Sequence, residues 1–399
     1  MAIEIRTPEP DEAEAVYAAD ARAFGGGYEP STIEEQSGIM ELDRFKVASD
    51  RGAIVGVVGA FSLEMTLPGG ATVPTAGVTW VGVAATHRRQ GLLSRLMEAL
   101  HDDAEERGDP IAALTASESA IYERFGYGAA SRVWVTRLDR ARAAFRPDVD
   151  VSPGSVRYVE GDEALAHVEK VWERYRRTRP GEVARVPAWQ EYLHTTRQRP
   201  SDGMSAAWYL AHADGYAIYR NTQNWDNGHA KSRVDILELV ATTPEAHAAL
   251  WHVLTNVDLV AELHSRMVPI DDPLPYLLRD FRALRTVELN DGLWICPLDA
   301  ATAFGARTYS TTDTLVVELA DAGERLRIEG SPEGATVKRV RTRPDLVTDR
   351  ATAGALLLGG VRTRQLVAGG RLTARNDAAL ARADLFFQGD VQPHCQTLF

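Results

Sequence analysis

The chain has 399 residues, enough for two or three domains of roughly 150 residues each. Its 44 basic and 56 acidic residues give a net charge of −12, which argues against nucleic acid as a partner because phosphate contacts need clustered Lys and Arg. Two cysteines exclude a disulfide framework and predict a reducing, cytoplasmic setting. We expect no signal peptide and no membrane span, since apolar runs reach about ten residues where a span needs roughly 20.

The first part of the chain, to about residue 139, alternates strand-like and helix-like segments. Strands are predicted at residues 3–6, 44–49, 52–63, 77–84, 111–116 and 133–138, and helices at 10–24, 90–106 and 119–125. Leu93, Leu96 and Leu100 lie at helical spacing in the 90–106 segment. This order of elements predicts an α/β (α+β) domain.

Two further regions follow a segment rich in Arg, Pro and Gly at residues 140–155. The second region is also αβ in pattern and ends near residue 289. The third begins near residue 292, with strands predicted at 314–319 and 325–329 and helices at 344–358 and 377–386. We place the three domains at residues 1–145, 155–290 and 291–399.

One stretch of the first region recurs in the second. Residues 83–86 lead into a helix with Leu93 and Leu96, and residues 240–243 lead, without a gap, into a helix with Leu250 and Leu254. The match predicts two domains of one fold, with chance similarity as the alternative because the match is short. The second copy loses the basic glycine-containing turn: Arg88, Arg89 and Gly91 become Glu245, Ala246 and Ala248.

The clearest chemistry lies at residues 80–94, where a β-rich run leads through a basic turn into a helix. The unpaired N–H groups and partial positive charge of a helix N-terminus bind phosphate. Gly91 lets a ligand approach the backbone, and Arg88 and Arg89 add positive charge beside it. The turn has neither the Gly-Lys-Ser/Thr ending of a P-loop nor the spaced glycines of a dinucleotide site.

This turn resembles the coenzyme A site of the GCN5-related N-acetyltransferases (GNAT), whose signature is Arg/Gln-x-x-Gly-x-Gly/Ala. Arg88 and Gly91 fit the signature, whereas Leu93 stands where Gly or Ala is usual. With residues 74–78 and 117–128, the turn is similar to the enhanced intracellular survival (Eis) family, and the resemblance runs the length of the chain. It implies two mixed-sheet GNAT domains, the second degenerate, and a C-terminal domain similar to sterol carrier proteins.

The resemblance also implies acetyl-coenzyme A as co-substrate, without a metal, and assigns its contacts. The pantetheine arm and the pyrophosphate would lie against Val81, Gly82, Val83, Arg88, Arg89, Gln90, Gly91, Leu92, Leu93, Ser94, Ser117 and Glu118. Without the family resemblance, each of these segments also has a purely structural interpretation. These interpretations are a buried strand, an exposed surface turn, and a helix cap followed by a first-turn carboxylate.

Two groups are expected to transfer protons. Tyr122 matches the family's general acid, and a phenol with a pKa near 10 suits protonation of a thiolate leaving group; the alternative is a core tyrosine, as we expect for Tyr127. In the Eis family the chain's own C-terminal carboxylate is the general base, which implies the α-carboxyl of Phe399. Its ordinary pKa of roughly 3.5 requires burial or a relaying water, and a frayed terminus is the alternative.

The acceptor is expected to be a primary amine. Family members that act on polycationic aminoglycosides have acidic pocket residues, but here Leu398 precedes the final residue and three glycines follow Phe24. Phe24 and Trp80 are predicted to form an aromatic wall. An aminoglycoside, another small amine or a lysine side chain of a partner protein therefore all remain open, as does a non-catalytic lipid-binding role. The resemblance further implies a homohexamer.

Overall fold

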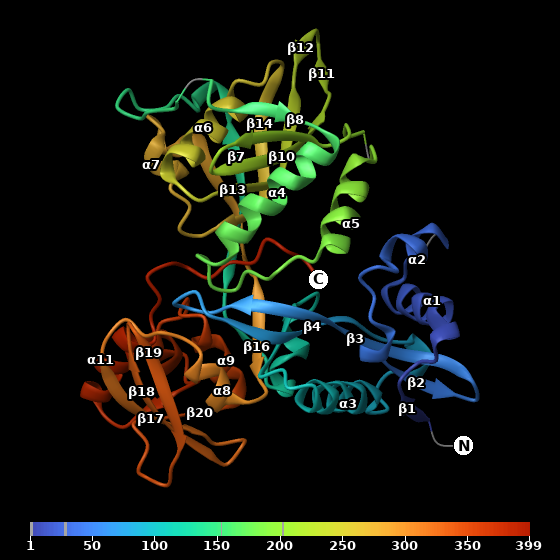
Figure 1. Cartoon of the computed structure of the whole chain (residues 1–399), viewed down its shortest axis with the longest axis vertical. Helices are drawn as coiled ribbons and strands as arrows, with labels where there is room; N and C mark the ends of the chain where they lie inside the picture. Colours follow the sequence, from blue (N-terminus) through green and yellow to red (C-terminus); the bar gives the residue numbers. More distant parts are fainter. Residues whose placement is uncertain (1–2, 28–29, 153, 202) are drawn as a thin grey trace. The chain divides into compact units, whose positions relative to one another are not determined.

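The computed structural model describes residues 3–27, 30–152, 154–201 and 203–399, which form two compact units. The first contains the chain up to Ser131, the short segment Pro180–Ala184 and Gly292–Phe399. The second contains Arg132–Arg179 and Arg185–Asp291. Figure 1 shows the helices and strands of both units. In the described parts of the chain, no helix has the length and apolar character to cross a membrane.

The first unit is built on a mixed sheet with the strand order β1-β2-β3-β4-β5-β16-β6. Its strands are β1 (Glu4–Arg6), β2 (Lys46–Asp50), β3 (Ala53–Thr66), β4 (Thr72–Val83), β5 (Ile111–Thr115), β16 (Leu293–Pro297) and β6 (Gly128–Ala129). The hairpin of β3 and β4 is longer than predicted at both strands. Pairing continues to Thr66 and Thr72 because a tight turn follows, in which Gly70 N–H donates to Leu67 O at 2.9 Å.

Helices cover both faces of this sheet. Helix α1 (Ala13–Phe24) packs Val16 and Ala19 against Val57, with the short α2 (Pro30–Gln36) following it. Helix α3 (Leu92–Glu106) packs Leu96 and Leu100 against Val58. Because neighbouring residues of a strand point to opposite faces, α1 and α3 lie on opposite sides of β3, as Figure 1 shows. The helix predicted at 119–125 is present as the two 3-10 turns Ser119–Ile121 and Glu123–Phe125.

Strand β16 follows the second αβ region in the chain but lies between β5 and β6 of the first sheet. It is antiparallel to both, with Ile295 opposite Ala113 and Gly128. Helix α9 (Arg350–Leu357) packs closely on these strands: a Cβ built on Gly128 would lie 1.8 Å from Ala351 O, and one on Gly354 2.0 Å from Ile295 O. Glycine is therefore required at both positions.

The remainder of the first unit is a C-terminal sheet of β17 (Asp313–Leu319), β18 (Glu324–Ser331), β19 (Gly334–Arg339), β20 (Leu346–Thr348) and β21 (Thr373–Ala374), with helices α8 (Ala300–Gly305), α9, α10 (Thr363–Ala368) and α11 (Asp377–Phe386). The prediction of one helix over 344–358 is wrong. Leu346–Thr348 pairs in parallel with β17, and the helix begins after Asp349, whose side chain accepts from Thr352 N–H at 2.7 Å.

The second unit has the strand order β15-β7-β14-β13-β10-β9-β8. Its strands are β7 (Arg132–Asp139), β8 (Arg157–Val159), β9 (Trp208–His212), β10 (Gly215–Thr222), β13 (Ser232–Ala241), β14 (Val260–Pro269) and β15 (Leu284–Asp291), and its helices are α4 (Gly161–Arg176), α5 (Pro187–Gln198), α6 (Pro244–Thr255) and α7 (Leu274–Leu277). The hairpin of β11 (Trp225–Asp226) and β12 (His229–Ala230) stands apart from this sheet. Strand β7, predicted at the end of the first region, pairs with β14 and β15 here.

The internal similarity corresponds to the same supersecondary unit in both sheets. Strand β13 pairs in parallel with β14, as β4 does with β5, and a helix follows each of the two first strands. The connections differ: α3 begins at Leu92, well after Val83, whereas α6 begins at Pro244, directly after Thr242 and Thr243. The second copy therefore has no room for the phosphate-type turn of the first.

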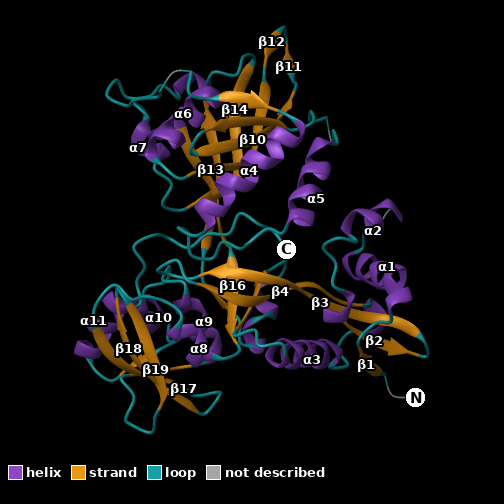
Figure 2. Cartoon of the chain, in the orientation of Figure 1, coloured by secondary structure: helices purple, strands orange, loops and turns teal. Residues whose placement is uncertain are grey.

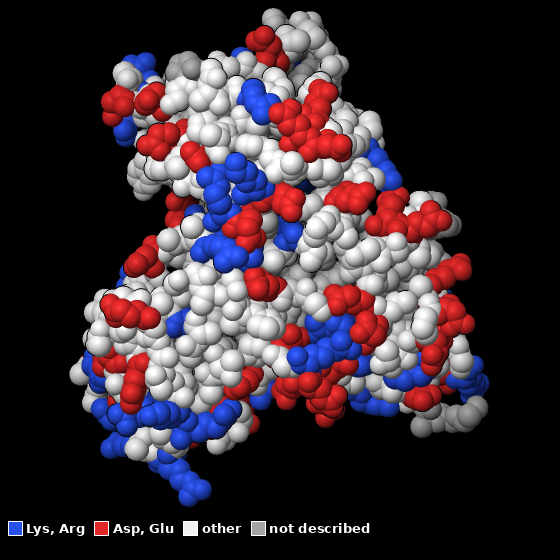
Figure 3. All heavy atoms as spheres, viewed as in Figure 1, with Lys and Arg blue, Asp and Glu red and all other residues white. Residues whose placement is uncertain are grey.

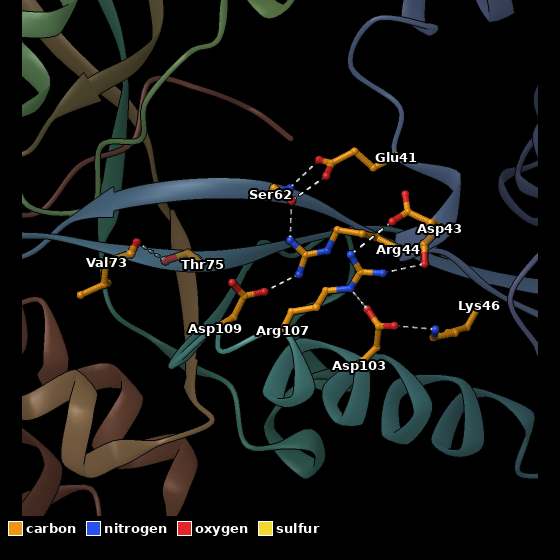
Figure 4. Close-up of polar contacts among 10 residues, drawn as sticks. All are labelled: Glu41, Asp43, Arg44, Lys46, Ser62, Val73, Thr75, Asp103, Arg107 and Asp109. Atoms are coloured by element: carbon orange, nitrogen blue, oxygen red, sulfur yellow. Dashed lines mark hydrogen bonds and ion pairs between the residues drawn. The ribbon is translucent and has the colours of Figure 1, made fainter.

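A polar network ties the β2 side of the first sheet to the end of α3. Arg44, almost fully buried, pairs with Asp109 and donates to Ser62 Oγ at 2.7 Å, while Ser62 in turn donates to Glu41 at 2.6 Å (Figure 4). Removing one partner of such a buried pair leaves an uncompensated charge. The network fixes β3 against the loop before β5, next to the strand that carries the site.

Charged side chains of both signs are mixed on one face of the protein. Figure 3 shows acidic and basic residues interspersed on the face in view. On this face the net charge of −12 is not gathered into a single acidic patch.

Candidate functional site

The site begins where two parallel strands separate. Pairing of β4 with β5 covers Thr75, Ala76 and Gly77 among the described residues, and it ends there although β4 continues to Val83. The β5-facing backbone groups of residues 78–83 are left for another partner. An extended amide-bearing ligand binds such an edge in the manner of an added strand.

A bulge in β4 marks the same stretch. Val57 pairs with Gly82 and Gly59 with Thr79, so two residues of β4 lie opposite one residue of β3. Trp80 takes up the bulge with φ of 54°, a conformation that costs energy for a bulky residue. Its ring packs edge-on against Tyr17 at 4.5 Å and Phe45 at 5.5 Å. These contacts hold the bulge and re-aim Val81–Val83.

The turn between β4 and α3 presents backbone N–H groups. Gly91 is the N-cap of α3 with φ of 74°, and a Cβ there would meet nothing within 4 Å. The first turn of α3 contains no acidic residue. Arg88 is held beside it, with its guanidinium donating to Val83 O at 3.3 Å and Ala23 O at 3.4 Å. An exposed helix N-terminus flanked by two arginines fits a pyrophosphate.

A cavity of about 370 Å³ joins these parts. Its walls include most of the predicted contacts, namely Phe24, Val81, Gly82, Val83, Arg88, Arg89, Gly91, Leu92, Leu93, Ser94, Ser117, Glu118 and Tyr122. Gln90 and Trp80 are not among the described residues that line it. Four lining residues were not predicted: Ala23, His87, Ile121 and Arg124. Ala23 could have been found from its place beside Phe24 in α1.

Tyr122 is part of the wall of this cavity. Its ring is buried, and its hydroxyl shares a hydrogen bond with the Ser117 side chain. Burial raises the pKa of Tyr122 above the ordinary tyrosine value near 10; the Glu118 carboxylate raises it further, and the Ser117 hydrogen bond partly opposes the shift. The phenol therefore holds its proton at neutral pH, as a general acid must.

Tyr127 differs from Tyr122 in every respect that matters for chemistry. It is fully buried, does not line the cavity, and its hydroxyl lies 2.8 Å from His101 Nε2. Burial, with a smaller effect of the Arg350 charge, lowers the pKa of His101 to about 4, so this imidazole is neutral. Tyr127 is thus a core residue with a satisfied hydroxyl.

The C-terminal residue lies over β4, upstream of the cavity. A Cβ built on Gly77 would lie 3.2 Å from Phe399 Cδ2 and 2.3 Å from Leu63 Cδ1, so the Phe399 ring packs above a position that must stay glycine. Phe399 is not among the described residues that line the cavity. Along the strand, Gly77 and Val81 are roughly 13 Å apart at 3.3 Å per residue.

Charge at the turn can be tested with Arg89, which is exposed at φ of 62°. We expect Arg89→Gln to raise KM for acetyl-coenzyme A several-fold with little change in kcat, because an exposed phosphate contact contributes modestly and is screened by salt. The difference in KM between Arg89→Gln and the parent protein should be smaller at about 0.5 M salt than at low salt. Arg51→Gln is the matched control, since Arg51 is exposed at φ of 52° outside the cavity. An equal rise in both variants would contradict a phosphate contact.

Comparison with protein families gives three matches along the chain. The profile of an acetyltransferase (GNAT) domain matches residues 4–130, a second acetyltransferase (GNAT) domain profile matches 181–294, and a sterol carrier protein domain profile matches 300–396.

Curated proteins and solved structures that are similar to this chain agree with these family matches. An uncharacterized N-acetyltransferase of Streptomyces avermitilis is 36% identical over 98% of each chain, and N-acetyltransferase Eis of Mycobacterium tuberculosis is 33% identical over 98% of each. The crystal structure of Eis1 from Mycobacterium abscessus matches with a TM-score of 0.90 and 31% identity, covering 99% of this chain and 100% of that one. A GCN5-related N-acetyltransferase from Anabaena variabilis, at 18% identity and a TM-score of 0.85, shares the fold.

Proposed function

Because the chain belongs to the Eis family of GCN5-related N-acetyltransferases, we propose that it acetylates a primary amine by direct attack on acetyl-coenzyme A in the cavity beside β4. Acetyl transfer and acetyl-coenzyme A use are properties of the family. The amine acceptor, the roles of individual residues and the order of proton transfers are proposals. The observation that carries them is one cavity lined by the unpaired end of β4, the N-terminus of α3 and Tyr122.

The shape of the site supports one orientation of the bound co-substrate, with its pyrophosphate at the start of α3 and its thioester end along β4. A pyrophosphate at Gly91–Ser94 leaves its pantetheine arm to follow the unpaired edge of β4 from Val83 toward Gly77. The thioester end of the arm then points toward the part of β4 that the Phe399 ring covers. Backbone N–H groups of this stretch are suited to the oxyanion that forms at the thioester carbonyl.

The reaction needs two proton transfers. A neutral amine attacks the thioester carbon, a C–N bond forms, and the C–S bond of the tetrahedral intermediate breaks. Tyr122 gives its proton to the departing thiolate, and the Phe399 α-carboxylate, directly or through a water, takes the proton of the new ammonium group. The phenolate is reprotonated from solvent after release of coenzyme A.

The acceptor pocket favours an amine of modest charge. Phe24, more than half exposed at the mouth of the cavity, offers an aromatic surface, and the residues after it are glycines. Leu398 stands exposed beside the terminal residue. These residues carry no carboxylate, and Glu118 is the one acidic side chain among the described residues that line the cavity. A single carboxylate suits a polycation poorly, so an arylalkylamine or a lysine-like amine is the better fit, with aminoglycosides as the alternative.

A lipid carrier is the rival reading, and one feature of the C-terminal domain opposes it. Arg307 is almost fully buried there and donates to the carbonyl oxygens of Leu356, Leu357 and Phe387 at 2.7–3.0 Å. Tyr309 stacks on Phe386 at 4.1 Å next to it. The interior around Arg307 is therefore filled by hydrogen-bonded and stacked side chains, which leaves no room for an apolar chain at that point.

The deciding experiment is an amine screen that follows free thiol released from acetyl-coenzyme A. Amine-dependent thiol release, with acetylated product seen by mass spectrometry, is expected for arylalkylamines and lysine derivatives before aminoglycosides. Acetylation of a protein without any free amine would indicate a protein-lysine acetyltransferase. Lipid in organic extracts with no turnover would contradict the enzymatic proposal. The family also leads us to expect a homohexamer, which light scattering at a monomer mass would contradict.

A further inference from the structure

A short segment from outside the first GNAT domain in sequence joins its sheet. Residues Pro180–Ala184 lie in the chain between α4 and α5, yet they belong to the first unit. Thr66 N–H donates to Glu182 O at 2.8 Å, and Ala184 N–H donates to Glu64 O at 2.9 Å. Since β4 occupies the other edge of β3 at these residues, the segment takes the edge that β2 leaves after Val58.

The C-terminal tail lies on this segment. Figure 2 shows the residues after α11 as an extended loop that ends at the C-terminus. His394 N–H donates to Pro180 O at 2.9 Å, and Gln396 N–H lies 3.1 Å from each carboxylate oxygen of Glu182. His394 and Thr397 are almost fully buried. A terminus held by these contacts is not frayed.

Glu182 is the unusual member of this contact. Its side chain is 0% exposed, and burying a carboxylate is costly unless hydrogen bonds compensate it. A hydrogen bond from a backbone N–H to a charged acceptor is roughly twice as strong as a neutral one. The Glu182 carboxylate binds the tail at the N–H of Gln396, three residues before the last residue.

The number of residues between this contact and the chain end limits how far the terminal carboxylate can move. Three residues reach about 10 Å, whereas five residues, counted from His394, reach about 17 Å. Releasing Gln396 therefore enlarges the volume open to the Phe399 carboxylate by at most about fivefold, because the buried Thr397 and the packed Phe399 ring still restrict the tail. The local concentration of that carboxylate at the reacting amine falls by the same factor.

We propose that Glu182 is a positioning residue that holds the C-terminal tail, so that the Phe399 carboxylate stays at the active site. This inference rests on the proposed function, because it gives Glu182 a role through the general base. It also gives the region of the second GNAT domain a structural role. The segment Pro180–Ala184, between α4 and α5, supplies the contacts that hold the C-terminal tail.

Two readouts test the inference independently of each other. In Glu182→Ala we expect hydrogen exchange of the Gln396 amide to accelerate at least tenfold. We expect kcat to fall by up to about fivefold, with the dissociation constant for acetyl-coenzyme A unchanged. Glu182→Gln keeps an acceptor and should retain most of both properties. Glu191→Gln, an exposed glutamate in α5, is the charge control and should behave as the parent protein.

A second background separates positioning from a structural effect. With Phe399 deleted, Glu182→Ala should cause no further loss of kcat, because the residue acts through the tail. A further fivefold loss there, or unchanged exchange at Gln396 in the full chain, would overturn the inference. Fast exchange at Gln396 with normal kcat would also overturn the inference, because the contact would then hold the tail without positioning the reacting group. Whether the Phe399 carboxylate is the base is decided separately, by deleting Phe399. If Glu182→Ala does not fold, Gln396→Pro carries the test, because it removes the N–H that the Glu182 carboxylate accepts from. The loss of kcat expected for Glu182→Ala should then appear in Gln396→Pro, and parent-level kcat there would overturn the inference.

Discussion

Replacing Tyr122 with phenylalanine is expected to lower kcat by a factor between about 10² and 10⁴, the range for loss of a general acid. The hydroxyl is the group that gives its proton to the coenzyme A thiolate, and the ring remains to fill its buried place. Ser117 loses a hydrogen-bond partner but is exposed, so water replaces it and the fold loses little stability. Steady-state kinetics with calorimetric binding of acetyl-coenzyme A measures both quantities.

Tyr127→Phe is the matched control for this change. It removes a hydroxyl of the same kind on the same short segment, one that lies 2.8 Å from His101 and outside the cavity. We expect a stability loss of about 1–3 kcal/mol with kcat nearly unchanged. If both variants lose activity equally, Tyr122 acts through packing and is not the acid.

The pH profile gives an independent check of Tyr122. An acid works in its protonated form, so its activity is present below its pKa and is lost as pH rises through it. Because burial raises the pKa of Tyr122 above about 10, the alkaline limb of kcat/KM due to this residue should lie above pH 10, roughly. A limb below pH 9 or so that disappears in Tyr122→Phe would contradict the raised pKa.

Deleting Phe399 is expected to lower kcat at least about 100-fold while acetyl-coenzyme A binding is retained. The deletion removes the ring above Gly77 and moves the α-carboxylate back by about 3.5 Å, beyond reach of the same proton. Phe399→Ala separates the two effects, because it keeps the carboxylate and removes only the ring. We expect it to lose less activity than the deletion; full activity in the deletion variant would rule out a terminal base.

Much of the catalytic domain could be predicted from local patterns. The spacing of Leu96 and Leu100 indicated α3 within two residues of its start, and Arg88 and Gly91 indicated the turn before it. The predicted fold, two GNAT domains followed by a sterol-carrier-like domain, is confirmed by the family matches. The predicted roles of Tyr122, Phe399 and the cofactor contacts stay predictions.

What could not be predicted depends on contacts between distant parts of the chain. The apolar run Leu293–Pro297 reads as a strand, but nothing local places it between β5 and β6. Glu182 looks like an ordinary loop glutamate until Gln396 is seen against it. Trp80 reads as a strand residue, and its positive φ follows from a bulge that needs both strands of the hairpin.

The place of β16 also bears on how the protein is made. Until Leu293–Pro297 is available, β5 and β6 of the first sheet have no strand between them. During synthesis Pro297 emerges about 170 residues after Ala129, which takes roughly 10–30 s at 5–20 residues per second. For that time the nascent catalytic domain carries exposed strand edges, which invite aggregation. The catalytic domain, first in the chain, must therefore be among the last parts to finish folding.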